Sequence, residues 1–155
     1  MTDADFPLPP IVAPSDARLL LVETFERPQV TQLRHMVAAA ATTAGVTGQR
    51  LEDFVLAVNE LITNAVRHGG GQGWLRLWRE ADSVVCEVSD TGHGMGVERL
   101  TNRERPAANT AGGWGLWLAG QVTDSMVMES GPAGTTVRIS TAITRTEPAA
   151  VERVE

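Results

Sequence analysis

The strongest constraint on the fold of this chain is a helical pattern of apolar residues between residues 51 and 65. Apolar side chains recur at i, i+3, i+4 and i+7 steps, which places them on one face of an α-helix. The run "HGGGQG" follows, and glycine suits a left-handed exit from a helix. The sequence therefore predicts a long amphipathic helix that must pack against another layer. The apolar positions are Leu51, Phe54, Val55, Val58, Leu61, Ile62 and Ala65.

The same helix carries a polar stripe beside its apolar face. Glu60, Asn64 and His68 in "NELITNAVRHGGG" are spaced four residues apart, so successive members lie about 40° apart around the helix axis. A carboxylate at the edge of an apolar face can have its proton affinity tuned, and an amide oxygen one turn away can join a Mg²⁺ shell. A solvated outer face, with Asn64 and His68 capping the helix end, explains the helix equally well. Both interpretations stay open from the helix alone.

The remaining elements predict an α+β fold, a two-layer α/β sandwich with its helices on one face of a sheet. Strands are indicated by short apolar or alternating runs, and helices by apolar residues at helical spacing. In chain order, the other expected elements are a strand at 18–25, a helix from Pro28 to Gly45, a hairpin of 74–80 and 83–90, a short helix at 116–124, and a last hairpin in which "GPAG" joins "SMVMES" to "TTVRIST".

Length and composition indicate one ordered domain. We expect it to span residues 18–145, between a flexible Pro-rich N-terminus (1–17) and a flexible C-terminal tail (146–155). A net charge of −6 and a pI near 5.1 argue against general binding to nucleic acid or to an anionic membrane. The sequence has no apolar stretch of membrane-spanning length and no signal-peptide pattern. With the single cysteine Cys86 unable to form an internal disulfide, the sequence predicts a cytoplasmic protein.

All 13 basic residues are arginine, so the chain contains no lysine. A Walker A phosphate loop, the strand lysine of ordinary protein kinases and a Schiff-base enzyme each need an amine on a flexible stem. The composition excludes these three classes. Any phosphate group must therefore be bound by other means.

Two glycine clusters offer such means. In "DTGHGMG" (90–96), an acid ends an apolar strand and glycines follow it. Glycines have no side chain and would let a flat ring approach the backbone, while the carboxylate would accept hydrogen bonds from an amino group on that ring. In "GGWGLWL" (112–118), glycines open a helix whose unpaired backbone N–H groups form a phosphate site without a basic side chain. Each cluster alone is more often a turn. Their order and separation carry the argument.

The boxes "NELITNAVRHG", "DTGHGM", "GGWGL" and "GPAGTTVRI" resemble the N, G1, G2 and G3 boxes of the Bergerat-fold ATPases. This group contains gyrase, histidine kinases and the anti-sigma serine kinases of bacterial switches. The likeness covers about residues 18–140. It implies a mixed, mostly antiparallel sheet with helices on one face, with ATP and Mg²⁺ as cofactors.

The resemblance also implies roles for individual residues. Glu60 would be the general base and Asn64 the Mg²⁺ ligand. Asp90 would bind the adenine amino group, and Thr135 would lie near the adenine. His68 resembles a residue common at this place in the small regulators, where a helix-end cap and a phosphate contact are both open.

Glycines and backbone groups would complete the ATP site. Gly92 and Gly94 would let the adenine ring approach. Met95 would belong to the ATP-binding set and begin an ATP lid at 95–112. The residues that would present backbone N–H groups to the phosphates are Gly113, Gly115 and Leu116.

Within this superfamily, the sequence resembles the single-domain anti-sigma factor kinases. They phosphorylate a serine on an anti-anti-sigma partner and otherwise hold a sigma factor inactive, so those two proteins are the implied partners, and homodimers are common among them. A sensor histidine kinase would need a phosphoacceptor histidine, and the candidate His35 lies in an ordinary packing helix. The alternatives are a non-catalytic ATP-binding adaptor of the same fold and a stand-alone ATP hydrolase or histidine-kinase-like catalytic piece.

Two features depart from a plain ATP site. Trp114 stands in the middle of "GGWGL", where many small regulators carry arginine or another polar or small residue, so ATP binding could be weaker or differently positioned. In "WLRLWRE", alternation places Trp74, Arg76 and Trp78 on one strand face, opposite Leu75 and Leu77. A partner or self-contact on one of those faces is a further possibility.

Overall fold

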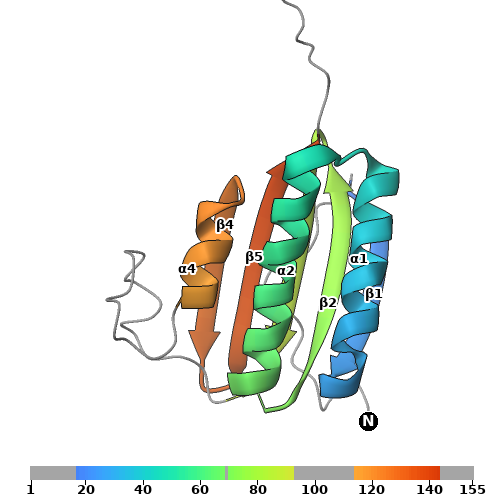
Figure 1. The fold of residues 1–155 in the computed structure, drawn as a ribbon. Coiled ribbons are helices and arrows are strands. Elements are labelled where there is room, and N and C mark those ends of the chain that lie inside the picture. The colour runs from blue at the N-terminus through green and yellow to red at the C-terminus, as the bar shows by residue number, and fades with distance from the viewer. Residues whose placement is uncertain (1–16, 69, 93–113, 144–155) are drawn as a thin grey trace, which may run out of the picture.

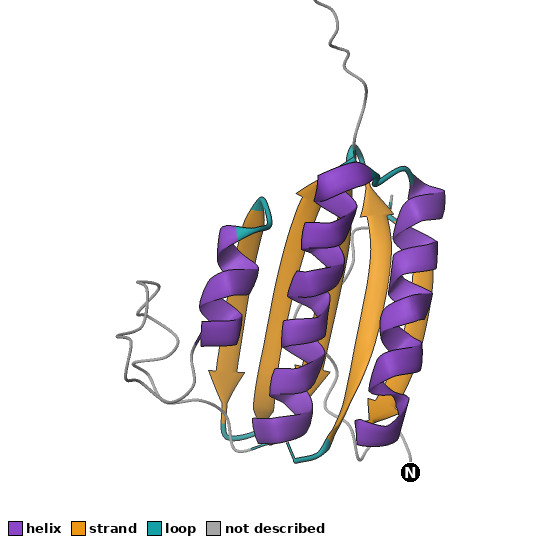
Figure 2. Ribbon diagram, in the orientation of Figure 1, coloured by secondary structure: helices purple, strands orange, loops and turns teal. Residues whose placement is uncertain are grey.

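Five strands form one sheet, and helices cover one of its faces (Figure 1, Figure 2). The computed structural model describes residues 17–68, 70–92 and 114–143. The expected α+β sandwich is confirmed. Its elements are β1 (Arg18–Glu26), the 3₁₀ turn η2 (Arg27–Gln29), α1 (Val30–Ala44), α2 (Gly48–His68), β2 (Gln72–Glu80), β3 (Ser83–Asp90), α4 (Trp114–Gln121), β4 (Ser125–Gly131) and β5 (Gly134–Ala142).

The sheet has the strand order β1-β2-β3-β5-β4. Each pairing between these described strands is antiparallel. The sheet was expected to be mixed and mostly antiparallel; its described part contains no parallel pairing. β3 lies at the centre, and β5 lies between β3 and the edge strand β4. Asp90, the last residue of β3, is therefore flanked by Gly73 of β2 and Thr135 of β5.

Local sequence signals end the elements where expected. α1 follows a turn that contains Pro28, and it ends at Gly45, whose φ of 115° lies in the left-handed region. Between β2 and β3, Ala81 has a φ of 54° and forms the tight turn with Asp82. Each of these turns keeps its two flanking elements antiparallel neighbours.

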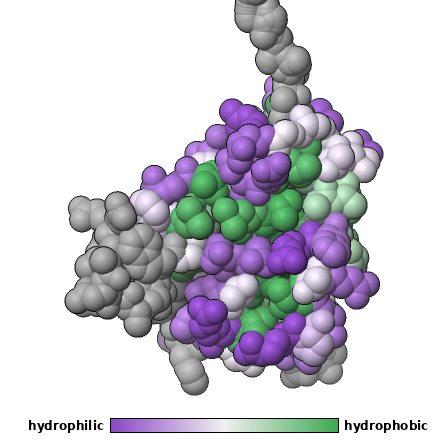
Figure 3. Space-filling view, viewed as in Figure 1, coloured by the Kyte–Doolittle hydropathy of each residue, from purple (hydrophilic) through white to green (hydrophobic). Residues whose placement is uncertain are grey.

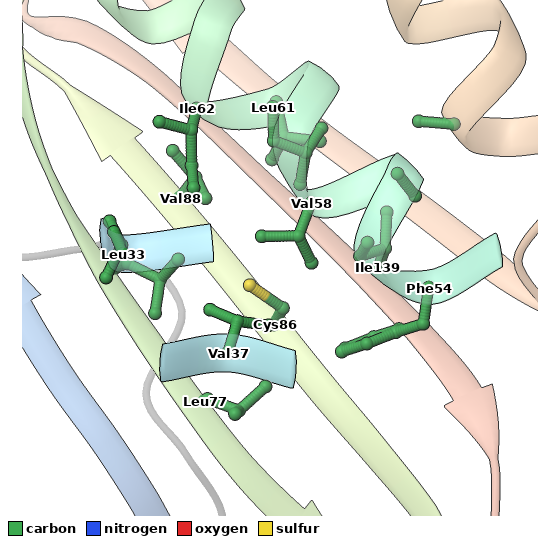
Figure 4. Close-up of a cluster of buried hydrophobic side chains, with 14 of the residues drawn as sticks. Leu33, Val37, Phe54, Val58, Leu61, Ile62, Leu77, Cys86, Val88 and Ile139 are labelled. Carbon is green, nitrogen blue, oxygen red and sulfur yellow. The ribbon is translucent and has the colours of Figure 1, made fainter. Parts of the chain in front are cut away.

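The core lies between the helical layer and the sheet. The apolar face of α2 predicted from the sequence points toward the central strands, and Figure 4 shows its side chains meeting those of the sheet. Burial raises the pKa of the Cys86 thiol well above its usual range, so this cysteine is a neutral core residue. Buried residues labelled in this view are Leu33, Val37, Phe54, Val58, Leu61, Ile62, Leu77, Cys86, Val88 and Ile139.

The sheet face opposite the helices holds an ion-pair cluster. Glu87 is 1% exposed, and its carboxylate accepts from Arg76 at 2.6 Å and from Arg138 at 3.1 Å. The guanidinium carbons of Arg76 and Arg138 lie 5.3 Å and 4.8 Å from the ring centroid of Trp78, which is fully buried. The predicted strand face of Trp74, Arg76 and Trp78 is therefore a packed polar layer at its centre.

Large exposed apolar side chains lie on both sides of the molecule. By register, Leu19 and Val22 neighbour Trp78 and Arg76 on the helix-free face, where they are 57% and 52% exposed. On the opposite side, Figure 3 shows a band of hydrophobic residues across the helical layer, with hydrophilic residues above and below it. Among the helices of the described residues, we find none whose length and apolar character would let it cross a membrane.

Candidate functional site

Asp90 is a buried acceptor at the end of β3. Its side chain is 8% exposed, and Oδ1 accepts from the backbone N–H of Gly92 at 3.0 Å and of Thr135 at 3.3 Å. Burial raises the pKa of Asp90 above its usual value, while those two N–H groups and the nearby His68 side chain lower it. Both of these hydrogen bonds, from described residues, use Oδ1. Among the described residues, Oδ2 therefore stays available to accept from a ligand.

Glycines bring the backbone close to Asp90. Gly134, which opens β5 with a φ of 136°, lies so near that a Cβ there would overlap the Asp90 carbonyl oxygen and lie 2.9 Å from the Cα of Thr91. A Cβ on Gly73 would lie 2.6 Å from the Ser89 carbonyl oxygen. Sequence reasoning singled out neither glycine, although strand register places both beside Asp90 or its neighbour. Their absent side chains leave the backbone packed tightly around the acid.

Thr135 lies directly beside the acid. It is buried, and its hydroxyl shares a 2.7 Å hydrogen bond with that of Ser130. Next along β5, the hydroxyl of Thr136 bonds that of Ser89 at 3.0 Å. These hydroxyl pairs tie β5 to both of its neighbours at the end of the sheet that carries Asp90.

The polar stripe of α2 runs from the middle of the helix to this end of the sheet. Glu60 and Asn64 are half-buried and His68 is exposed. His68, at the end of α2, is close enough to lower the pKa of the Asp90 carboxyl. Gly70, just beyond α2, faces Gly92, because a Cβ on Gly70 would lie 4.0 Å from the Gly92 Cα. One helix thus connects the surroundings of Asp90 with those of Glu60.

α4 begins beside the middle of α2 (Figure 1). Gly115, its second residue, contacts Glu60 so closely that a Cβ at Gly115 would overlap the Glu60 Oε1 atom and lie 3.4 Å from its Cδ. Leu116 is buried in the core and fixes the first turn of α4. The carboxylate of Glu60 therefore lies beside the first turn of α4.

The predicted site residues within the described part fall into two neighbouring groups. Asp90, Gly92 and Thr135 form one group at the sheet end, and Glu60 with Gly115 and Leu116 forms the other at the start of α4. Asn64 lies one helical turn from Glu60 on the way to the first group. The predicted residues Gly94, Met95 and Gly113, and the predicted lid at 95–112, lie outside the described residues.

The side-chain amide oxygen of Asn64 is a ligand type that suits a magnesium site shared with a bound phosphate group. Mg²⁺ prefers oxygen ligands and is usually held by one or two protein groups together with phosphate oxygens and water. Within the described ranges, no group of three or more His, Cys, Asp and Glu side chains could hold a metal ion. A metal here would therefore depend on the oxygens of a bound phosphate group.

Residues 24–141 match the model of the histidine kinase-like ATPase domain. Because this match covers more than half of the chain, the chain belongs to that family. The resemblance seen in the glycine boxes is thereby confirmed at the level of family and fold. Membership in this ATPase family implies that the chain binds ATP.

Solved structures share the fold. The RsbU and RsbW domains of Rv1364c from Mycobacterium tuberculosis superpose with a TM-score of 0.60 at 20% identity, over 84% of this chain and 33% of that one. The histidine kinase domain of a blue-light-activated kinase from Erythrobacter litoralis gives a TM-score of 0.52 at 16% identity, over 74% of this chain and 65% of that one. At these identities the likeness establishes the fold alone.

A relative in sequence is the sensor protein kinase PilS from Pseudomonas aeruginosa. It is 39% identical over 75 residues, which are 45% of this chain and 14% of PilS. The aligned part is thus a small fraction of that protein. It adds a second kinase to the proteins that this chain resembles.

Proposed function

We propose that the chain binds Mg²⁺ and ATP and transfers the γ-phosphoryl group to a serine of an anti-anti-sigma protein. In the alternative state of this switch it holds a sigma factor inactive. One observation carries the proposal: α2 connects two carboxylates. The buried acceptor Asp90 lies at the end of β3, near the end of α2, and Glu60 of the same helix lies beside the first turn of α4. The fold shared with the RsbW domain of Rv1364c supports the choice within the family.

The adenine end of the nucleotide lies at Asp90. Oδ2 accepts from the adenine amino group, because the backbone N–H groups of Gly92 and Thr135 use Oδ1. Gly92 lets the ring approach the main chain, together with the sequence-predicted Gly94 and Met95. A carboxylate with both oxygens directed in this way selects a ring that presents an N–H donor.

The phosphates lie at the start of α4. Its first backbone N–H groups have no intrahelical acceptor, and the helix dipole favours an anion there. Gly113, Gly115 and Leu116 contribute these groups in the proposal. This arrangement accounts for a nucleotide site in a chain without lysine.

Glu60 acts as the general base in the transfer. It accepts the proton of the serine hydroxyl while the hydroxyl oxygen bonds to the γ-phosphorus and the bond to the bridging oxygen of ADP breaks. Asn64 would hold Mg²⁺ together with phosphate oxygens, and the ion would neutralise part of the phosphate charge. Asn64 lies one helical turn from Glu60 on α2, so it would position the phosphate oxygens near this base.

A second candidate is the catalytic piece of a histidine kinase, which the PilS similarity favours. The two candidates differ in the acceptor. A phosphoserine survives acid treatment, whereas a phosphohistidine is hydrolysed by it. The acid stability of the product therefore separates them.

The deciding experiment incubates the protein with γ-labelled ATP, Mg²⁺ and a serine-bearing anti-anti-sigma protein. The matched control partner has its serine replaced by alanine. We expect acid-stable label on the serine partner and none on the control. Label that is acid-labile, or that appears only as free phosphate, would refute the serine kinase.

The proposal extends to the cellular setting. A regulator of this kind works in the cytoplasm, without direct contact to nucleic acid or membrane, and as a homodimer. Size-exclusion chromatography with light scattering measures the oligomeric state. A monomer at working concentration would remove the dimer from the proposal and leave the chemistry unchanged.

A further inference from the structure

A row of polar side chains crosses the end of the sheet on the side that faces the helices. Asp90 of β3 pairs with Thr135 of β5, and Thr135 in turn pairs with Ser130 of β4. Residues directly opposite each other on neighbouring strands project to the same face, with Cβ atoms roughly 4.5–5.5 Å apart. The face is given by alternation, because the residues two positions away on each strand belong to the core or pack against it. These residues are Val88, Val137 and Met128.

Thr135 is joined to both of its neighbours in this row. Its backbone N–H donates to Asp90 Oδ1 at 3.3 Å, and its hydroxyl oxygen lies 2.7 Å from that of Ser130. Thr135 is 5% exposed, and Ser130 is half-buried. Either hydroxyl of the pair can be the donor. Only if Ser130 donates does the Thr135 hydroxyl keep its own proton for a third group.

The edge of adenine needs such a proton beside the carboxylate. Its amino group is a donor, and the adjacent ring nitrogen N1 is an acceptor; guanine has a carbonyl oxygen and an N–H at these places. In the proposed function, Asp90 Oδ2 accepts from the amino group. The group that meets N1 must therefore donate, and the Thr135 hydroxyl lies next to Asp90 on the same face.

We propose that Ser130 is a positioning residue for adenine, whose hydroxyl donates to Thr135 Oγ1 and so directs the Thr135 proton to N1. This inference rests on the proposed function and adds to it a residue of the edge strand β4. It also gives a reason for base selectivity. Guanine would bring an acceptor to the Asp90 carboxylate and a donor to the Thr135 proton, so both contacts would be repulsive.

The role of Ser130 is tested by titration calorimetry with ADP and Mg²⁺. Ser130→Ala removes the donor to Thr135, so the affinity for ADP should fall by about three- to tenfold. Ser130→Thr keeps a hydroxyl and should recover the wild-type affinity to within about twofold. Equal affinities of wild type and Ser130→Ala would overturn the inference.

The matched control is Ser125→Ala. Ser125 shares a hydrogen bond between hydroxyl groups with Ser140, which joins the same two strands at the other end of their pairing. Loss of this pair should leave the affinity for ADP within about twofold of wild type. A loss as large as that in Ser130→Ala would mean that any weakening of this strand pair disturbs the site, and the positioning role would be wrong.

The analogue 1-deaza-ADP separates positioning from a structural role, because it carries C–H in place of N1. Wild type should bind it about three- to tenfold more weakly than ADP. With no acceptor for the Thr135 proton, Ser130→Ala should change the affinity for the analogue by less than about twofold. If Ser130→Ala weakens ADP and 1-deaza-ADP by the same factor, Ser130 supports the fold alone and the inference is wrong.

These outcomes distinguish the inference from the proposed function. If wild type binds no ADP, the proposed nucleotide site is wrong, and the role of Ser130 is wrong with it. If wild type binds ADP and 1-deaza-ADP equally, the nucleotide site stands and only the role of Ser130 is wrong.

Discussion

The backbone N–H of Thr135 donates to Oδ1 of Asp90 at 3.3 Å, across the pairing of β5 with β3. A strand from the far end of the chain thus orients an acid at the end of the central strand. The second N–H on the same oxygen, from Gly92 at 3.0 Å, fixes the carboxylate plane further. Which oxygen is directed to a ligand is decided by these backbone donors.

Asp90→Asn should weaken the binding of adenine nucleotides by at least about tenfold, or roughly 1.4 kcal/mol. The amide oxygen would keep the two backbone donors, which turns the NH₂ group toward the adenine amino group, donor against donor. Titration calorimetry with ATP and Mg²⁺ measures the change, with Glu52→Gln as control. Wild-type affinity in Asp90→Asn would show that the base binds elsewhere.

Asp90 should also make stability depend on pH. Burial raises its folded-state pKa above the ordinary 3.8, so the folded protein holds this proton to higher pH than the unfolded chain does. The stabilising contribution is fully present below about pH 3.8 and is lost as pH rises through the folded-state pKa. Denaturant unfolding from pH 4 to 8 should therefore show wild type losing stability relative to Asp90→Asn. Parallel curves would contradict the assignment.

The effect of Gly115→Ala on the free energy of unfolding should change sign when Glu60 is replaced by alanine. In wild type the new Cβ collides with the Glu60 carboxylate, at a cost of about 1–3 kcal/mol that exceeds the gain of about 1 kcal/mol from replacing glycine in a helix. In Glu60→Ala the collision is gone, so the same change should stabilise. Urea unfolding of the four proteins gives the coupling energy. Additive effects would mean that the two residues do not touch.

Gly134→Ala should destabilise the fold by about 2–4 kcal/mol. Its φ of 136° is unfavourable for alanine, and the Cβ would collide with the backbone of Asp90. The matched control is Gly131→Ala at the other end of the same turn, where a Cβ meets nothing within 4 Å. That control should change stability by less than about 0.5 kcal/mol. Similar thermal melts for the two variants would refute the close approach.

Glu87→Gln should lower the free energy of unfolding by about 2–4 kcal/mol. The change leaves Arg76 and Arg138 against each other without the carboxylate that they both bind. Glu129→Gln on the exposed edge strand β4 is the control and should change it by less than about 0.5 kcal/mol. Urea unfolding compares them. Equal effects would show that the cluster contributes little to stability.

The sequence was sufficient to predict the helices and strands because the patterns that indicate them are local. The helical spacing of Leu51 to Ala65 predicted α2 and the face that it buries, which the structure confirms. Alternation in β2 separated Leu75 and Leu77 from Trp74, Arg76 and Trp78, but it did not decide which face is the core; the structure buries Leu75 and Leu77 against the helices. The order of the glycine boxes identified the family.

Contacts between distant segments could not be predicted in the same way. Alternation places Glu87 on the helix-free face, but it does not reveal that arginines from both neighbouring strands bury it there. The contact of Glu60 with Gly115 depends on how α4 packs on α2, which no local pattern encodes. Gly134 was visible only as part of a turn, since its approach to Asp90 comes from strand register.

The strand order has a consequence for synthesis on the ribosome. β5, the last strand of the sheet, lies between β3 and β4. Until residue 142 has left the exit tunnel, the nascent chain carries β3 with one open edge and β4 with no neighbour, and open edges invite intermolecular pairing. A stalled or truncated chain that lacks β5 should therefore aggregate or be held by chaperones, and the acid at the end of β3 acquires its second backbone donor only in the final step of assembly.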